Sequence, residues 1–385
     1  MNTLFTGADI FDGARSGPGS LLVKDGRIAA MLPPDAKVDG AETVKLDGGV
    51  LAPGFVDLQL NGGGGVMFND APNVKTLTRI AAAHASLGSL TILPTLITDT
   101  PDQTRAAVEA VEAAIAAGVG GIAGLHLEGP HLSIARKGAH DPSLIRPMGE
   151  GDLAFLCDAA RRLPRLMVTL APESVTDDQI ATLSGVGIIV SLGHTDAGFD
   201  RCVSAAKSGA RLATHLFNAM SQLGSREPGL VGAVLSTGAL DAGLIADGIH
   251  VHPKVMRAAL RAKTGPGEIF LVTDAMAPAG SNISQFSLNG REIRREDGRL
   301  MLADRTLAGA DLSMARAIRV ICNDVGLPRD RALAMATSVP ARVLGLSGSC
   351  GTLAAGRDSD FVHLTESFEL QGVWQKGQPI GVTSG

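Results

Sequence analysis

The chain has 385 residues, of which 45% are hydrophobic and 19% are charged, and its formal net charge at pH 7 is −5. This composition is that of a globular α/β enzyme and excludes a disordered or fibrous chain. A chain with this negative net charge lacks the positive surface potential that binding to a phosphate backbone requires, so we expect no nucleic-acid partner. A small anion stays possible, because a few local cations suffice to bind one phosphate.

Export and membrane insertion are not predicted either. The first residues show no basic stretch followed by an apolar run, and nowhere do 18 apolar residues follow one another. The four cysteines are far apart and form no CxxC pair, which favours reduced structural thiols over disulfides or a thiolate metal site. We therefore expect a cytoplasmic protein with no membrane partner.

The two ends of the chain both have the character of short strands separated by turns. Residues 20–32, SLLVKDGRIAAML, place an Asp-Gly dipeptide between two apolar arms, which is typical of a β-hairpin. The C-terminal stretch has the same glycine-punctuated pattern. We predict that residues 1–52 and 348–385 form one small β-sandwich domain, and that residues 53–347 form a catalytic domain.

Between the ends, apolar runs rich in strand-forming residues alternate with Ala-rich segments of helical period, such as residues 100–118 and 197–210. The eight runs are residues 54–61, 89–97, 121–129, 166–173, 186–195, 211–218, 242–251 and 269–276. Eight parallel strands close naturally into a (β/α)8 TIM-like barrel of about 250 residues. An open doubly wound sheet is the alternative, but no GxGxxG follows the first strand.

Polar and ionisable residues gather where these runs end. They are Asp57, Gln59, Asn61, Glu128, His194, His215, His250 and Asp274. In a barrel these strand ends meet at one face, where active sites form. Two imidazoles and a carboxylate are ligands for Zn²⁺ or Fe²⁺ and leave a position open for water, as a metal-dependent hydrolase requires.

Nine short motifs in order carry a family resemblance over essentially the whole chain. They are PGFVDLQLNG at 53–62, HLEGP at 126–130, KGAH at 137–140, GHT at 193–195, HLFNAM at 215–220, REPG at 226–229, DGIH at 247–250, TDA at 273–275 and LAG at 307–309. The chain resembles the N-acetylglucosamine-6-phosphate deacetylases of the amidohydrolase superfamily. The resemblance implies hydrolysis of the acetamide of a phosphorylated amino sugar, in amino-sugar metabolism.

The resemblance also implies how the metal and the proton are handled. Glu128, His194 and His215 would bind one divalent metal per subunit, Zn²⁺ or Fe²⁺, and Asp274 would act as general base and then general acid. Most amidohydrolases carry His-x-His on the first strand, where this chain has Gln59 and Asn61. Amides are poorer ligands than imidazoles, so we expect a weak or empty second site, with Gln59 near the metal or its water, as in the similar single-metal branch.

The substrate contacts carry over in the same way. The resemblance implies that His140, Asn218 and Ala219 meet the sugar and acetamide, with His140 polarising the carbonyl. The backbone of Leu307, Ala308 and Gly309 would close the pocket. His250 and Arg226 would bind the phosphate, and Arg226 would come from the neighbouring subunit of a homodimer. The planar fork of arginine suits a phosphate.

Several histidines and one glutamate are left without a firm assignment. His84 and His363 are interpreted as packing residues, His126 as either a core residue or a support for the metal ligands, and Glu173 as an orienting group. His131 receives no role. Two other functions stay open at this point, namely a cyclic-amide hydrolase of the same superfamily and a non-catalytic scaffold, although the former favours His-x-His and a carboxylated lysine.

Overall fold

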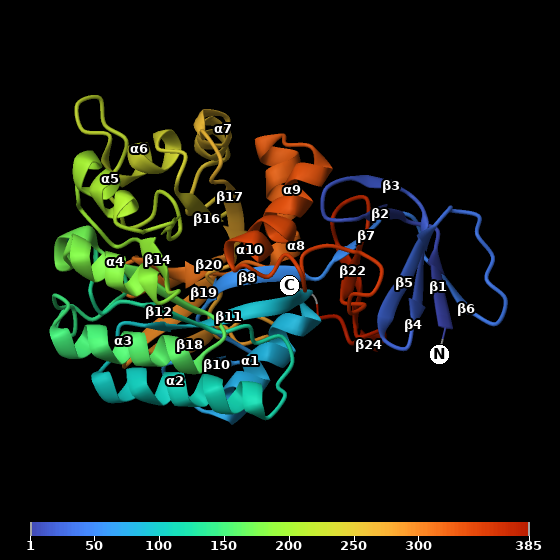
Figure 1. The fold of residues 1–385 in the computed structure, drawn as a ribbon, viewed down its shortest axis with the longest axis horizontal. Coiled ribbons are helices and arrows are strands. Elements are labelled where there is room, and N and C mark those ends of the chain that lie inside the picture. The colour runs from blue at the N-terminus through green and yellow to red at the C-terminus, as the bar shows by residue number, and fades with distance from the viewer. Residues whose placement is uncertain (1, 384–385) are drawn as a thin grey trace.

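Eight parallel strands follow one another in chain order around the centre of the molecule, with helices outside them (Figure 1). The structure, a computed structural model, describes residues 2–383. The barrel strands are β8 (Phe55–Leu60), β11 (Ser89–Ile97), β12 (Leu125–Glu128), β13 (Leu166–Leu170), β14 (Ile189–Leu192), β15 (Leu212–Ala213), β16 (Asp241–Ile245) and β17 (Ile269–Val272). Each coincides with one of the eight apolar runs, β16 beginning one residue earlier, so the predicted (β/α)8 barrel is confirmed.

The barrel closes where its last strand meets its first. Beyond the end of β17, the backbone N–H of Asp274 donates to the carbonyl of Gln59 at 2.9 Å, and that of Asn61 donates to Ala275 at 2.7 Å. Below these bonds, the buried carboxylate of Asp57 accepts the Thr273 hydroxyl at 2.5 Å. Burial raises the pKa of Asp57 to about 7, although the hydrogen bonds from Thr273 oppose the rise. The first strand is therefore joined to the last by polar contacts that also place residues 59, 61 and 274 side by side.

Helices cover the outside of the barrel. They are α1 (Val74–Ser86), α2 (Pro101–Ala116), α3 (Glu150–Arg162), α4 (Asp177–Gly185), α5 (Phe199–Lys207), α6 (Gly229–Ser236), α7 (Pro253–Ala262), α8 (Met314–Val320), α9 (Arg329–Ala336) and α10 (Ser338–Val343). In α2 the side chain of Thr100 accepts from the N–H of Gln103 and Pro101 occupies the first turn, which is a favourable helix start. No helix of the described residues is long and apolar enough to cross a membrane.

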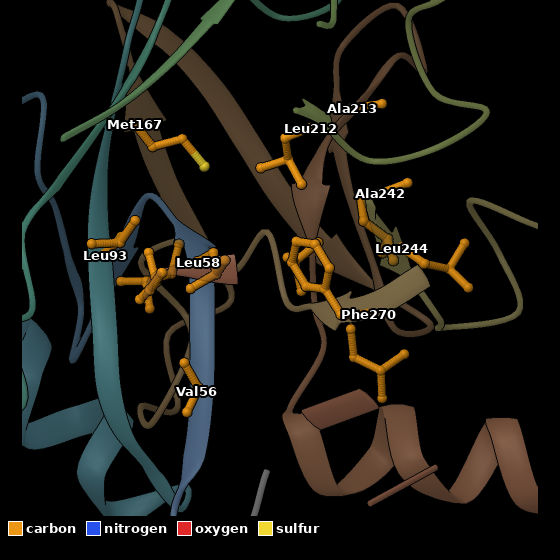
Figure 2. Close-up of a cluster of buried hydrophobic side chains, with 14 of the residues drawn as sticks. Val56, Leu58, Leu93, Met167, Leu212, Ala213, Ala242, Leu244 and Phe270 are labelled. Atoms are coloured by element: carbon orange, nitrogen blue, oxygen red, sulfur yellow. The ribbon is translucent and has the colours of Figure 1, made fainter. Parts of the chain in front are cut away.

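The strands and helices share one continuous apolar core. Figure 2 shows part of it, where Leu58 of β8, Met167 of β13 and Phe270 of β17 are buried together with side chains of β11, β15 and β16. Each of these three side chains is at most 2% exposed. Since full burial of such a side chain contributes roughly 1.5–3 kcal/mol, the core holds the strand ends in fixed relative positions.

The two ends of the chain pair into a β domain beside the barrel, at the right of Figure 1. Its strands are β1 (Asn2–Thr6), β2 (Asp9–Phe11), β3 (Ser16–Pro18), β4 (Ser20–Lys24), β5 (Arg27–Leu32), β6 (Glu42–Lys45), β7 (Val50–Pro53), β22 (Phe361–Leu364), β23 (Leu370–Gln375) and β24 (Gln378–Ile380). The C-terminal β22 pairs with the N-terminal β7, and Phe5 contacts Phe361 with ring centroids 5.0 Å apart. The predicted hairpin is formed by β4 and β5. The domain limits given above stay a prediction.

A second small sheet, which the sequence did not predict, follows the last barrel strand. It consists of β18 (Gln285–Leu288), β19 (Arg291–Glu296), β20 (Arg299–Leu302) and β21 (Leu307–Ala310). Leu288, Ile293 and Leu300 are fully buried in a cluster with Met67 and Met276. Met67 belongs to a short hairpin of β9 (Gly62–Gly63) and β10 (Val66–Met67). We call residues 285–310 the cap, because Leu288 and Leu307 reach the cavity described below.

His84 provides a test of the packing against β9. Its ring is 1% exposed, and Nε2 lies 2.8 Å from the carbonyl oxygen of Gly62. Burial lowers the pKa of His84 to about 4, although the bond to Gly62 opposes this. As the pH falls, His84 becomes protonated near pH 6.5 in the unfolded chain but only near pH 4 in the folded chain. The buried neutral imidazole of His84 therefore contributes fully to the free energy of unfolding above about pH 6.5. This contribution is lost as the pH falls from about 6.5 to about 4.

We therefore predict that His84→Gln, which keeps a hydrogen-bond donor, reduces the fall in unfolding free energy between about pH 6.5 and pH 4, by up to roughly 3 kcal/mol for a shift of this size. Urea denaturation at a series of pH values measures it. An unchanged pH dependence in the variant would contradict a buried neutral imidazole.

Candidate metal centre and active site

Three buried ligand groups converge at the carboxyl ends of the barrel strands. Glu128 is the last residue of β12, while His194 and His215 follow β14 and β15 by two residues. The Oε1 atom of Glu128 lies 3.1 Å from Nε2 of His194 and 3.1 Å from Nε2 of His215. The two Nε2 atoms are also 3.1 Å apart. Within residues 2–383 this is the one group of three His, Cys, Asp or Glu side chains that converges in this way.

The protonation of His194 shows what this triangle of atoms can bind. Nδ1 of His194 lies 2.8 Å from the carbonyl oxygen of Arg136, which can only accept, so Nδ1 carries the proton. Nδ1 is thus engaged, which leaves Nε2, beside the carboxylate of Glu128 and Nε2 of His215, as the nitrogen available to a metal. Ligand atoms around a tetrahedral ion at about 2.1 Å are roughly 3.4 Å apart, close to the spacing found here. The residues fit a divalent metal ion.

The electrostatics of the cluster also favour positive charge next to the carboxylate of Glu128. Burial opposes ionisation of Glu128, but the hydrogen bonds and charges of His194 and His215 outweigh it and hold the pKa of this carboxyl well below its ordinary value. Burial likewise opposes protonation of His215, yet Glu128 raises the pKa of that imidazole. A cation bound between the three groups satisfies all of them at once.

Backbone conformation aims the side chains inward. His194, His215 and Asp274 have φ angles of 46°, 31° and 50°, in the left-handed region that residues other than glycine rarely occupy. Gly193 precedes His194, and a Cβ there would lie 2.9 Å from side-chain atoms of both Thr169 and Thr214. Such local strain is held in place by the surrounding barrel and is concentrated at functional sites.

Asp274 lies beside the cluster and is bound by two amides. Nδ2 of Asn61 donates to Oδ1 of Asp274 at 2.7 Å, and Nε2 of Gln59 donates to the same atom at 3.3 Å. Nε2 of Gln59 also donates to Glu128 at 3.2 Å. Burial and the charge of Glu128 raise the pKa of Asp274 to about 6, whereas His215 and Asn61 oppose the rise. A carboxyl with a pKa near the working pH is suited to both accept and donate a proton.

These groups line a cavity of about 270 Å³ at the mouth of the barrel. Its wall contains Asn61, Ile97, Glu128, Gly138, Ala139, His140, His194, His215, Asn218, Ala219, Ile245, His250, Asp274, Met276, Leu288, Thr306, Leu307 and Gly309. The predicted residues His140, Asn218, Ala219, His250, Leu307 and Gly309 are thus brought together with the candidate ligands. Two predicted residues, Gln59 and Ala308, do not line the cavity. Gln59 instead forms hydrogen bonds to Glu128 and Asp274, which do line it. Ala308 is fully buried.

Two further histidines face the cavity, each held by a partner. Nδ1 of His140 lies 2.7 Å from the hydroxyl of Thr98, and Nε2 lies 4.0 Å from Oε2 of Glu128. Burial, assisted by the charge of His194, holds the pKa of His140 well below its ordinary value. In the loop that follows β16, Nδ1 of His250 lies 2.6 Å from the buried carboxylate of Asp247. The sequence contained Asp247 in the DGIH motif, but its orienting contact was not predicted.

Arg226 is the predicted site residue that this chain does not bring to the cavity. It is exposed in the loop before α6, and it is not among the described residues that line the cavity. Its neighbour Glu227 fixes the loop by accepting from the N–H of Phe199 at 2.8 Å and of Gly229 at 3.0 Å. Arg226 therefore lies at the surface of its own chain, outside the lining of the cavity.

The residues left open by the sequence take supporting positions. His126 lies one layer below Glu128, with Nε2 2.7 Å from the Thr169 hydroxyl, in a polar layer that continues to Thr214 and Ser191. Glu173 accepts from the hydroxyl of Thr195, next to His194. His131 instead lines a separate cavity of about 470 Å³ between α2 and α3, so it does not reach the candidate site. His84 and His363 are buried.

A closed parallel barrel with a buried carboxylate, two imidazoles and a second carboxylate at its carboxyl-terminal face defines a class of protein, the (β/α)8-barrel hydrolases with a divalent-metal site. Comparison with known proteins narrows the class. Residues 50–384 match the model of the amidohydrolase family. The chain belongs to this family.

Individual relatives are similar over nearly the whole chain. A curated N-acetylgalactosamine-6-phosphate deacetylase of Shewanella sp. is 42% identical over 87% of this chain and 84% of its own length. The solved structure of an N-acetylglucosamine-6-phosphate deacetylase from Pasteurella multocida has a TM-score of 0.93 and 34% identity, covering 98% of this chain and 99% of its own. A variant of the Mycobacterium smegmatis enzyme in complex with N-acetyl-D-glucosamine-6-phosphate has a TM-score of 0.90 and 34% identity, covering 99% and 100%.

Proposed function

We propose that this chain hydrolyses the acetamide of N-acetylglucosamine 6-phosphate to give glucosamine 6-phosphate and acetate. The observation that carries the proposal is the content of one cavity, which joins the Glu128, His194 and His215 cluster, the titratable Asp274 and the oriented His250. The names of the two similar solved structures and of the Mycobacterium ligand support the same substrate.

N-acetylgalactosamine 6-phosphate is the second candidate substrate, because the Shewanella relative that bears this activity in its name is 42% identical to the chain. The two sugars differ only in the configuration of one hydroxyl, so both present the same acetamide and phosphate. A cyclic-amide hydrolase is disfavoured, since the amides of Gln59 and Asn61 are hydrogen-bonded to carboxylates and the described lining of the cavity contains no lysine. A non-catalytic scaffold is disfavoured because the ligand cluster and Asp274 are all in place.

The polar residues in and around the cavity receive roles in this reaction. Glu128, His194 and His215 would hold one divalent ion per subunit, Zn²⁺ or Fe²⁺, which when bound supplies the charge that lowers the pKa of water and polarises a carbonyl. Asp274 takes a proton from the attacking water and returns it to the leaving amine. His140 donates to the acetamide carbonyl. Gln59 and Asn61 keep Asp274 aimed at the cluster.

The remaining residues position the sugar. Asn218 and Ala219 contact the sugar and acetamide, while the segment Leu307, Ala308 and Gly309 closes the pocket from the cap. His250, oriented by Asp247, binds the phosphate. Arg226 completes the phosphate site of the other subunit in a homodimer, and its exposure here, close in sequence to Leu223 at 58% exposure, supports a contact surface in that loop. We place this enzyme in the cytoplasm, where charged sugar phosphates are retained.

The first prediction concerns the substrate. Acetate release should be efficient with N-acetylglucosamine 6-phosphate and far slower with unphosphorylated N-acetylglucosamine, because His250 and Arg226 have no dianion to bind in the latter. An enzymatic acetate assay with these two compounds and N-acetylgalactosamine 6-phosphate measures kcat/KM for each. A clear preference for the galactosamine compound would replace the sugar in the proposal, whereas equal rates with and without phosphate would contradict the phosphate site.

The second prediction concerns the general base. Asp274→Asn keeps the shape of the side chain and its contact with Asn61, but the amide cannot take up the proton of the attacking water. The variant should lose at least ~10²-fold in kcat, while elemental analysis shows a metal content close to that of the parent. Retention of most activity would remove Asp274 from the mechanism.

The third prediction concerns the shared site. Loss of a charge-assisted contact costs about 1.5–3 kcal/mol, so Arg226→Ala should lower kcat/KM roughly 10- to 100-fold. A mixed dimer of Arg226→Ala with Asp274→Asn should then regain about half of the parent activity, because one pocket has its own Asp274 and the partner's intact arginine. If arginine acts within its own chain, no pocket is complete, and activity stays at the level of the mutant homodimers.

A further inference from the structure

Thr98 contacts His140 through two different groups. It is the residue directly after β11, it is 1% exposed, and it lies next to the loop that carries His140. The Thr98 hydroxyl oxygen is 2.7 Å from Nδ1 of His140. The backbone N–H of Thr98 donates to the same nitrogen at 3.3 Å. Two polar groups of one residue are thus directed at one ring nitrogen.

The backbone N–H decides which nitrogen of the ring carries the proton. A buried N–H needs an acceptor, and among the described residues the acceptor found for Thr98 is Nδ1 of His140. An imidazole nitrogen accepts only when it is unprotonated. If Nδ1 carried the proton, two N–H groups would face each other and the amide of Thr98 would be buried without a partner. The ring therefore carries its proton on Nε2.

The direction of the hydrogen bond made by the Thr98 hydroxyl follows from this assignment. Its oxygen also lies 3.3 Å from the carbonyl oxygen of Glu128, which is the competing acceptor for its single proton. With Nδ1 unprotonated, the short 2.7 Å contact can be a hydrogen bond only if the hydroxyl donates to the ring. Gly129 makes this placement possible, because a Cβ at residue 129 would lie 2.1 Å from the hydroxyl oxygen of Thr98.

We propose that Thr98 is a positioning residue that fixes His140 in the tautomer with its proton on Nε2, so that His140 presents an N–H donor to the cavity. His140 lines the cavity together with the ligand cluster. In this tautomer the ring donates a hydrogen bond to an oxygen of the bound molecule, whereas the other tautomer would direct a lone pair at it. The catalytic consequence rests on the proposed deacetylase function, in which that oxygen belongs to the acetamide carbonyl. The tautomer itself does not depend on that function.

Two measurements on the Zn²⁺-loaded full chain test the proposal. The first is the ¹⁵N chemical shifts of ring nitrogens in histidine-labelled protein, which identify the protonated nitrogen; the chain has nine histidines, and His140→Gln assigns the signal. The second is steady-state acetate release by Thr98→Val, which removes the hydroxyl at nearly constant volume, and by Thr98→Ser, which restores it. Thr237→Val is the matched control, because the Thr237 hydroxyl is buried with no hydrogen-bond partner among the described residues.

The proposal expects an unprotonated Nδ1 in the parent protein and also in Thr98→Val, because the backbone N–H of residue 98 is retained while the second contact, from the hydroxyl, is lost. It also expects kcat to fall about tenfold in Thr98→Val, as for loss of one hydrogen bond, with KM little changed, and to return in Thr98→Ser. A parent His140 protonated on Nδ1, or an unchanged kcat in Thr98→Val, overturns it. Failure of the deacetylase function would appear separately, as absent acetate release by the parent, while the ring shifts still decide the tautomer.

Discussion

The convergence of three lone-pair donors in a dry site is the constraint on which the rest of this structure depends. A carboxylate and two imidazoles whose ligand atoms lie 3.1 Å from one another are buried at the mouth of the barrel. Isolated burial of such groups is costly, and a divalent cation between them offsets that cost. The hydrogen bonds of the neighbouring residues keep the three donors in place.

These hydrogen bonds come from barrel strands that are distant in sequence. At the seam between β8 and β17, Asp57 binds Thr273 below the cluster, and Asn61 binds Asp274 at its level. Gln59 connects Asp274 to Glu128 across the same seam. Under the cluster, hydrogen bonds run from His126 through Thr169 to Thr214, which directly follows β15, and on to Ser191, so that they link β12, β13, β15 and β14. The residues that close the barrel therefore also orient the groups that carry the proposed chemistry.

The sequence predicted the barrel from periodic apolar runs, and the metal cluster, Asp274 and His250 from the ends of those runs. The other predicted residues of the cavity, His140, Asn218, Ala219, Leu307 and Gly309, were expected only from the family resemblance. Buried parallel strands read as apolar runs, and a histidine or carboxylate where such a run ends has few structural explanations. The cap was not predicted, since strands such as Arg291–Glu296 are largely charged and lack an apolar run. Thr98 and Asp247 were missed as partners, because a hydroxyl or carboxylate that orients another side chain has no pattern of its own. Arg226 cannot be placed in a site from one chain, since the proposed contact lies between two.

The central claim is that one divalent ion is held by Glu128, His194 and His215, and X-ray absorption spectroscopy of the purified protein tests it most directly. The account predicts a single ion per chain whose spectrum contains two imidazole nitrogens and carboxylate oxygen, and a Glu128→Ala variant in which this ion is lost. Two ions per chain at a metal to metal separation of about 3.5–4 Å, or a full ion content in Glu128→Ala, would contradict it.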